Sequence, residues 1–245
     1  MDRKEFLKKS ITSFGMFSIL PVLNACESKT VSTDNQTDST NIGSTNGTSP
    51  GDCSVTNAET AGPFPIKDAA SLVMNNIKGD RLGIPLTLKI NIKNINTSCG
   101  NLPNVLVDVW HCDAKGEYSE YGGTGLQAAN NTNVHWLRGR QTTDSNGLST
   151  FESIFPGWYS GRAPHIHVHV YTSGGKSLLV TQIAFPKSIC DTVYTTASDY
   201  KSKGIQDTTN EIDNVFRDGF ANEMGTLTGS VSEGYVLTHN IVVSA

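Results

Sequence analysis

The chain has 245 residues, of which 37% are hydrophobic and 17% are charged, and its formal net charge at pH 7 is −4. This balance is that of an ordinary soluble protein. The net negative charge, with no cluster of Lys and Arg interleaved with aromatic residues, argues against a nucleic-acid-binding protein.

Residues 1–26 have the pattern of a secretory signal. A basic start (Arg3, Lys4, Lys8, Lys9) precedes an apolar run over 11–22 that is shorter than the roughly 20 residues of a membrane span. The run ends in "LNAC", which resembles a bacterial lipobox and predicts a lipid on Cys26. The alternative is simple signal cleavage with loss of Cys26.

Residues 27–52 consist almost entirely of small and polar residues, so we expect a flexible tether there. The remaining residues, 53–245, suit one folded domain. Together these features predict an exported protein on the cell envelope, which touches the membrane only through its N-terminal lipid.

Four cysteines lie in the folded part: Cys53, Cys99, Cys112 and Cys190. Outside the cytoplasm an even number is consistent with two disulfides, which could pair in three ways. The sequence does not choose among these pairings. Because no pair has C-x-x-C spacing, a thiolate metal site is not expected.

Patterns of period two, typical of strands, recur along the folded part, and they cover 83–95, 104–114, 148–155, 165–172 and 178–185. The C-terminal "GSVSEGYVLTHNIVVSA" adds another strand pair, and a helical period is visible only weakly over 208–220. Short strands with turn signals predict an all-β fold, a single-domain sandwich of mostly antiparallel strands with its active site on loops.

The segment "PGWYSGRAPHIHVHVY", residues 156–171, places three histidines in alternation: His165, His167 and His169. Alternate side chains of a strand point to one face. A lone strand histidine is more often half-buried and hydrogen-bonded than a metal ligand. A row of three, beside Tyr159 and Arg162, favours a metal site, because two ligands at i and i+2 have a fixed spacing.

Other metal folds that use H-x-H fit the chain poorly. A cupin needs a Glu soon after the motif, a copper–zinc superoxide dismutase needs differently spaced histidines, and a zinc hydrolase needs a nearby carboxylate. The chain instead offers phenols, in Tyr118 and Tyr159. A strong cation deprotonates a bound phenol despite its ordinary pKa near 10. Two His and two Tyr therefore indicate Fe³⁺.

Four separated motifs carry a family resemblance: "ETAGPFP" (59–65), "VDVWHCDAKGEYSEY" (107–121), "FESIFPGWYSGRAPHIHVHVY" (151–171) and "TQIAF" (181–185). They resemble the intradiol ring-cleavage dioxygenases, relatives of protocatechuate 3,4-dioxygenase and the catechol 1,2-dioxygenases. The resemblance extends over about residues 53–200 and agrees with the β-sandwich predicted above.

The resemblance implies a non-haem Fe(III) whose ligands match Tyr118, Tyr159, His165 and His167. It also implies that Arg162 lies over the substrate ring and that Gln182 is a polar residue supporting the site. Tyr121 is an alternative ligand to Tyr118. His169 is outside the motif and is expected to be a supporting or structural histidine. For Trp110, Trp158 and Phe64 we expect packing or a place in the pocket wall.

The implied substrates are a catechol and O₂, and the implied product is a cis,cis-muconate that holds both oxygen atoms. Tyr159 is then the ligand that takes a catechol proton and dissociates, while Tyr118 stays bound. Arg162 is a preorganised positive charge for the anion that develops on the substrate.

Two features depart from the family pattern. Only five residues separate Tyr159 from His165, where aromatic-degrading members carry a longer insertion, so a more open site is expected. A signal and tether also replace the helical dimerisation region of catechol 1,2-dioxygenases. Two other functions remain open: a surface module that captures catecholates without turnover, and a structural β-sandwich whose histidines bind metal adventitiously.

Overall fold

The structure is a computed structural model that describes residues 53–245. The predicted signal, the lipid on Cys26 and the tether over 27–52 lie outside the described residues. No helix within residues 53–245 is long and apolar enough to cross a membrane.

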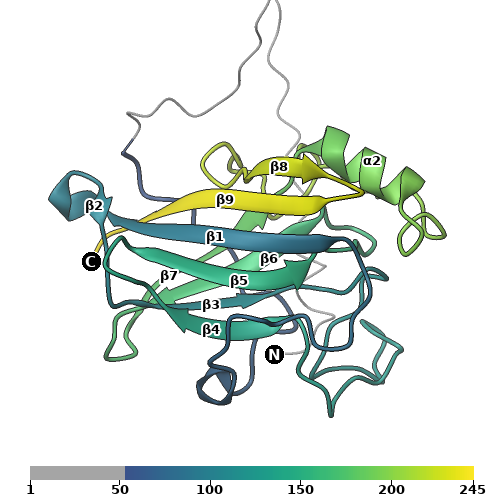
Figure 1. Cartoon of the computed structure of the whole chain (residues 1–245), viewed down its shortest axis with the longest axis horizontal. Coiled ribbons are helices and arrows are strands. Elements are labelled where there is room, and N and C mark those ends of the chain that lie inside the picture. The colour runs from purple at the N-terminus through teal and green to yellow at the C-terminus, as the bar shows by residue number, and fades with distance from the viewer. Residues whose placement is uncertain (1–52) are drawn as a thin grey trace, which may run out of the picture. The chain divides into compact units, whose positions relative to one another are not determined.

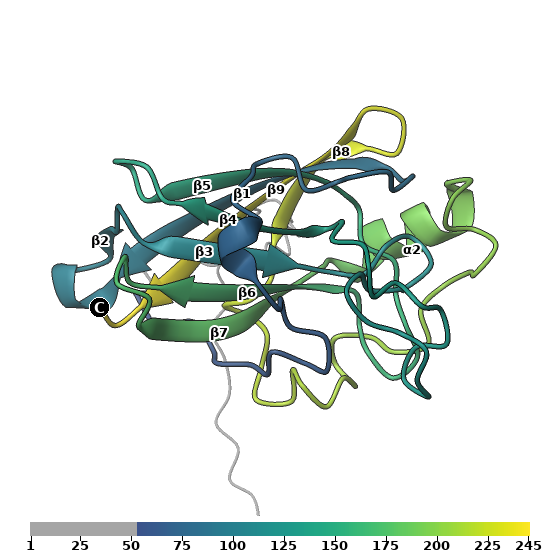
Figure 2. The ribbon, with the colours of Figure 1, turned by 90° about the horizontal axis from the view of Figure 1, so that it is seen from below.

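Two β-sheets pack face to face in the described part of the chain (Figure 1). One sheet holds β2 (Gly100–Asn101), β1 (Pro85–Asn94), β9 (Gly234–Val243) and β8 (Thr226–Ser230) in that order, with β5 (Leu148–Ile154) also paired to β1. The other has the order β4 (Arg138–Thr142), β3 (Leu106–Trp110), β6 (His165–Tyr171) and β7 (Ser177–Ala184), and it faces the viewer in Figure 2.

All strand pairs are antiparallel except β1 with β9. Short helical elements complete the described chain: η1 (Ala69–Ser71), η2 (Ile95–Thr97) and α2 (Lys187–Thr196). The predicted all-β sandwich of mostly antiparallel strands is therefore confirmed.

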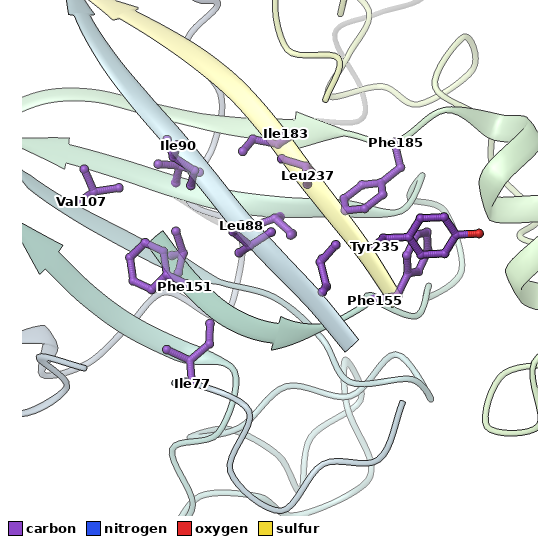
Figure 3. Packing of buried hydrophobic residues seen from close by; sticks show 14 of the residues in the cluster. Ile77, Leu88, Ile90, Val107, Phe151, Phe155, Ile183, Phe185, Tyr235 and Leu237 are labelled. Carbon is purple, nitrogen blue, oxygen red and sulfur yellow. The ribbon is translucent and has the colours of Figure 1, made fainter. Parts of the chain in front are cut away.

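The core lies between the sheets because each strand turns one set of alternate side chains inward. On β1 the inward set is Leu86, Leu88, Ile90 and Ile92, each at most 1% exposed. These residues meet side chains from the second sheet, including Val107 of β3 and Ile183 of β7 (Figure 3).

Strand β6 is buried on both faces, and this places the candidate site. Ile166, Val168 and Val170 point into the core. His165 and His167 point to the opposite face, yet are only 2% and 1% exposed. The outer face of the second sheet is therefore covered by further chain, which allows a buried polar site there.

The strand predictions agree with the structure in position, but two expectations on secondary structure were wrong. The weak helical period over 208–220 forms turns, and an α-helix lies at Lys187–Thr196 instead. In these turns Asp207 and Asp213 accept hydrogen bonds from another loop, and such side-chain bonds compete with a helix. Strand β4 was not predicted, because its sequence "RGRQT" lacks an apolar alternation.

One disulfide, not two, is present among the four cysteines of the described chain. Cys53 pairs with Cys99, and their Cα atoms are 5.8 Å apart. Cys112 and Cys190 are free and buried. Cys112 lies among aromatic rings at the candidate site, whereas Cys190 lies on α2 in the main core, so the fold keeps the two thiols in separate clusters.

Candidate metal centre

A row of three paired residues crosses the outer face of the second sheet. His167 of β6 lies opposite Trp110 of β3 on one side and opposite Gln182 of β7 on the other. Directly paired residues share a face of the sheet. The Trp110 ring stacks on the His167 imidazole with centroids 4.8 Å apart and planes within 2°. Trp110 therefore fixes the plane of this imidazole.

Four side chains with metal-binding atoms converge beside this row, and we call them the four-donor cluster: Tyr118, Tyr159, His165 and His167. The Nε2 atom of His165 lies 3.1 Å from Nε2 of His167. The same atom is 3.2 Å from the Tyr159 hydroxyl oxygen and 3.5 Å from that of Tyr118. All the residues that the sequence nominated as ligands thus meet at one point.

Two packed turns bring the tyrosines together. Tyr118 follows a turn in which Asp113 accepts hydrogen bonds from the backbone N–H groups of residues 115 and 117. The N–H of Gly157, just before Tyr159, donates to the Asp113 carbonyl at 3.0 Å. Gly116 has a φ of 88°, and a Cβ there would overlap the carbonyl of Trp158. Only glycine allows the two turns to approach this closely.

The segment 59–65 covers the cluster, and we call it the covering segment. Its Thr60 carbonyl accepts a hydrogen bond from Gln182 Nε2 at 2.9 Å. A Cβ on Gly62 would lie 3.0 Å from the His167 ring, so the backbone passes directly over that ligand candidate. The Phe64 ring packs 5.1 Å from the ring of Tyr118. This segment excludes water from one side of the cluster.

Burial dominates the protonation of the cluster. Desolvation, reinforced by the positive charge of Arg162, lowers the pKa of His165 and of His167 well below the ordinary value. Both imidazoles are therefore neutral at pH 7. The Nδ1 of His165 is 2.6 Å from the Ala163 carbonyl and must carry the proton, which leaves a free lone pair on Nε2.

The two phenols differ in their surroundings. Burial and then the neighbouring Tyr159 raise the pKa of Tyr118 well above the ordinary value, and Tyr118 is only 1% exposed. Burial also raises the pKa of Tyr159, while Arg162 opposes the rise. Both phenols are thus protonated without a cation nearby, and a strong cation is needed to make them phenolates.

The donor set fits a hard trivalent cation. Adjacent ligands about 2.1 Å from one ion lie about 3 Å apart, near the spacing of the cluster. No group of three His, Cys, Asp or Glu side chains able to hold a metal occurs within residues 53–245. The phenols supply the missing donors here, and phenolate oxygen suits Fe³⁺ better than Zn²⁺.

Tyr121, the alternative ligand to Tyr118, and His169 both lie apart from the four-donor cluster. The Tyr121 hydroxyl donates to the Pro65 carbonyl at 2.7 Å, so it helps to anchor the covering segment. His169 is at the far end of β6, where it stacks on Tyr171 at 3.8 Å and contacts the Ser177 hydroxyl. His169 is therefore a structural histidine.

Arg162 lies beside the cluster. Its Nη1 is 3.4 Å from His165 Nε2, and its Nη2 donates to Gln182 Oε1. The structure thus joins Arg162 and Gln182 as a pair. Trp158, in contrast, donates its indole N–H to the Gly204 carbonyl and packs against the main core.

Sequence reasoning missed two charged residues at the site. Asp213 receives the Nε–H of Arg162 at 2.9 and 3.0 Å. Arg138 is fully buried behind the tyrosines, where it donates to the Phe64 carbonyl and to Ser119. Neither has a local signal, because Asp213 lies in a turn region 51 residues from its partner and Arg138 starts a strand without apolar alternation.

Comparison with known proteins agrees with this geometry. Residues 62–217, which include the four-donor cluster, match the protein family described as Dioxygenase. An intradiol ring-cleavage dioxygenase from Tetranychus urticae has a similar structure, with a TM-score of 0.70 at 27% identity over 78% of this chain and 95% of that chain. The chain belongs to the intradiol ring-cleavage dioxygenase family.

Two further proteins are similar to this chain, one in its fold and one over part of its sequence. The dioxygenase domain of a carbohydrate-binding fusion protein from Streptomyces sp. SirexAA-E shares the fold, with a TM-score of 0.56 at 24% identity over 78% of this chain and 99% of that chain. The catechol 1,2-dioxygenase of Acinetobacter baylyi is 33% identical over 100 residues, which are 34% of this chain. The match spans only 30% of the length of that relative.

Proposed function

We propose that this chain is a non-haem Fe(III) intradiol dioxygenase, which inserts both atoms of O₂ between the hydroxyl-bearing carbons of a catechol and forms a cis,cis-muconate. The observation that carries the proposal is the convergence of two phenols and two neutral imidazoles on one point. Membership of the family and the adjacent Arg162 support it further.

The chain's own residues have separate tasks in this proposal. Tyr118, Tyr159, His165 and His167 hold the ion. Bound Fe(III) would withdraw electron density from a chelated catechol and so make its ring carbons reactive toward O₂. Arg162 Nη1 faces the cluster as a fixed positive charge, where it stabilises negative charge that develops on the substrate.

Tyr159 is suited to leave when substrate binds. It is half-buried, whereas Tyr118 is almost fully buried, and it sits on a turn rather than beneath the covering segment. Held as a phenolate by the ion, its Oη would take a proton from a catechol hydroxyl, and burial, which raises the pKa of this phenol above the ordinary value, favours the protonated form. A protonated Tyr159 then vacates space for the substrate oxygen, while Tyr118 stays in place.

The first experiment combines a visible spectrum with iron analysis and an assay. The purified full chain, loaded with Fe³⁺, is expected to hold about one iron per chain and to show a broad phenolate-to-Fe³⁺ charge-transfer band. Addition of catechol in air is expected to produce muconate absorbance together with uptake of one O₂ per catechol.

The alternative outcomes separate the other functions. A coloured protein that binds catechol without O₂ uptake would replace this proposal with the catecholate-capture module. A protein that stays colourless after Fe³⁺ loading would contradict the iron site itself and favour a structural β-sandwich.

We also propose that the protein is exported and lipid-anchored through Cys26. The signal pattern of residues 1–26 carries this proposal, and the Cys53–Cys99 disulfide supports it, because such bonds persist mainly outside the reducing cytoplasm. Labelling with a radioactive fatty acid should mark the wild type and not Cys26→Ser. Equal labelling of both proteins, or none, would contradict the lipid.

A further inference from the structure

Asp213 contacts two components of the candidate site through one carboxylate. Its two oxygens lie 2.9 and 3.0 Å from Arg162 Nε. The same carboxylate accepts the Ala163 N–H at 2.8 Å and the Val215 N–H at 2.9 Å. The Asp213 side chain is fully buried, so these are well-shielded contacts.

The first consequence concerns the direction of the Arg162 guanidinium. Its nitrogens form a rigid planar fork. Asp213 holds the Nε edge and Gln182 accepts from Nη2, which leaves Nη1 turned toward the four-donor cluster. Two buried acceptors on different elements thus determine which nitrogen faces the substrate. Without Asp213, the side chain loses its only carboxylate partner and the acceptor for Nε–H, and the guanidinium is less restrained in direction.

The second consequence concerns His165. Asp213 accepts the N–H of Ala163, and the carbonyl of the same residue, which belongs to the next peptide group, lies 2.6 Å from His165 Nδ1. That contact keeps the proton on Nδ1 and the lone pair on Nε2. Asp213 therefore acts on a predicted ligand through a single residue.

A third consequence is the charge of the site. A buried guanidinium without a partner is costly. Asp213 balances Arg162, so the ion and its phenolates need not compensate this positive charge. We propose that Asp213 is a positioning residue of the dioxygenase site, which orients Arg162 Nη1 and fixes the tautomer of His165. This inference rests on the proposed function for its catalytic consequence.

The key variant is Asp213→Asn, which keeps the shape but puts an N–H₂ against donor groups. Asp207→Asn is the matched control. Asp207 lies in the same loop region and holds the same turn, through Ser160 and the N–H of Gly161, but it does not contact Arg162. Asp213→Glu tests whether charge alone restores the function.

With catechol, Asp213→Asn is expected to lower kcat about 100-fold with a less than threefold change of KM, because a misdirected charge impairs the transition state more than binding. Asp207→Asn should stay within about twofold of the wild type, and Asp213→Glu should recover part of kcat. A folded Asp213→Asn protein with unchanged kcat overturns the inference.

Two further measurements do not depend on turnover. The first uses metal-free protein labelled with ¹⁵N-arginine, in which the Nε–H signal of Arg162 is identified by its loss in Arg162→Lys. This Nε–H should be protected from hydrogen exchange in the wild type and in Asp207→Asn. It should not be protected in Asp213→Asn. Iron affinity should fall about 10-fold in Asp213→Asn. The inference is overturned if Asp213→Asn and Asp207→Asn show equal protection of Arg162 Nε–H and equal affinity for iron.

The same measurements also distinguish the proposed dioxygenase function from the proposed role of Asp213. If the wild type binds iron but does not oxidise catechol, the proposed function fails, while a selective loss of iron affinity in Asp213→Asn still supports positioning. If Asp213→Asn does not fold, the wild type decides the question instead, and an Arg162 Nε–H that exchanges rapidly in the folded, metal-free wild type overturns the inference.

Discussion

At the scale of single residues, two tyrosines three positions apart have different contacts. Tyr118 places its hydroxyl at the four-donor cluster, whereas the Tyr121 hydroxyl donates to the backbone of Pro65. Both rings pack against Phe64, at 5.1 and 5.2 Å. Replacing either tyrosine by Phe removes one hydroxyl group. The two variants therefore form a matched comparison, which differs only in the contact that the hydroxyl made.

We predict that Tyr118→Phe loses the charge-transfer band of the iron-loaded protein or shifts it strongly, and that its kcat with catechol falls at least 100-fold. The reason is the loss of one phenolate donor, which changes the charge at the metal. Tyr121→Phe should keep the band and kcat within about threefold. Visible spectra and oxygen uptake check both variants. The opposite ranking would assign Tyr121 as the ligand.

At the scale of elements, the covering segment meets a buried carboxyl from the chain before β8. Glu223 is fully buried and accepts a hydrogen bond from the Thr181 hydroxyl at 3.0 Å. Desolvation, and then the charge of Glu59 in the covering segment, raises the pKa of Glu223 to about 8. The pKa of Glu59 is itself raised to about 7 by burial and by Asp218.

This arrangement makes stability depend on pH. Because Glu223 has a folded pKa of about 8 against an ordinary 4.5, the folded state keeps a proton that the unfolded state releases. The contribution of Glu223 to the free energy of unfolding should therefore fall as pH rises from about 4.5 to about 8. His239, whose pKa is lowered to about 4 by burial, acts in the opposite sense at acid pH.

A pair of variants isolates the contribution of Glu223. Between pH 5 and pH 8 the melting temperature of the wild type should fall at least about 4 °C more than that of Glu223→Gln, which cannot ionise. Glu152→Gln, an exposed change on β5, should follow the wild type. Parallel pH profiles for the wild type and Glu223→Gln, measured by calorimetry, would contradict this assignment.

At the scale of the whole molecule, one covalent bond ties the chain before the covering segment to the end of the first sheet. The disulfide joins Cys53, the first described residue, to Cys99, which directly precedes β2. The two cysteines are 46 positions apart in the sequence. Closing a loop of this size lowers the entropy of the unfolded chain and is worth about 4 kcal/mol in the chain-entropy description. It also restrains the chain that leads from Cys53 to the covering segment.

We predict that the double change Cys53→Ser with Cys99→Ser lowers the free energy of unfolding by about 2–4 kcal/mol. Urea denaturation of the oxidised wild type and the variant measures the difference. Reduction of the wild type should give the same loss. An unchanged midpoint in both cases would show that the bond does not constrain the unfolded chain.

The other two cysteines should be unreactive in the folded protein. Cys112 and Cys190 are buried, and burial raises the pKa of both thiols above the ordinary value, so little thiolate is available. Alkylation followed by peptide mapping should modify neither residue in native protein and both in urea. Modification of either under native conditions would indicate opening of its cluster.

Local patterns in the sequence predicted much of this fold and site. Alternation along β1 and β6 is a property of neighbouring residues, because a strand sends every second side chain to one face. The same rule placed His165 and His167 together. The weak period over 208–220 misled because hydrogen bonds to a loop distant in sequence, which no local pattern reveals, replaced the helix.

By itself, then, the sequence determined the strands with an apolar alternation, the shared face of the histidines and a family resemblance, because these depend on residues close along the chain. The tertiary structure alone decided which cysteines pair and which carboxylate holds Arg162. Asp213 and Arg162 are 51 residues apart, and nothing local to either one specifies the other. Such partners are chosen by packing and burial, which exist only once the sheets have formed.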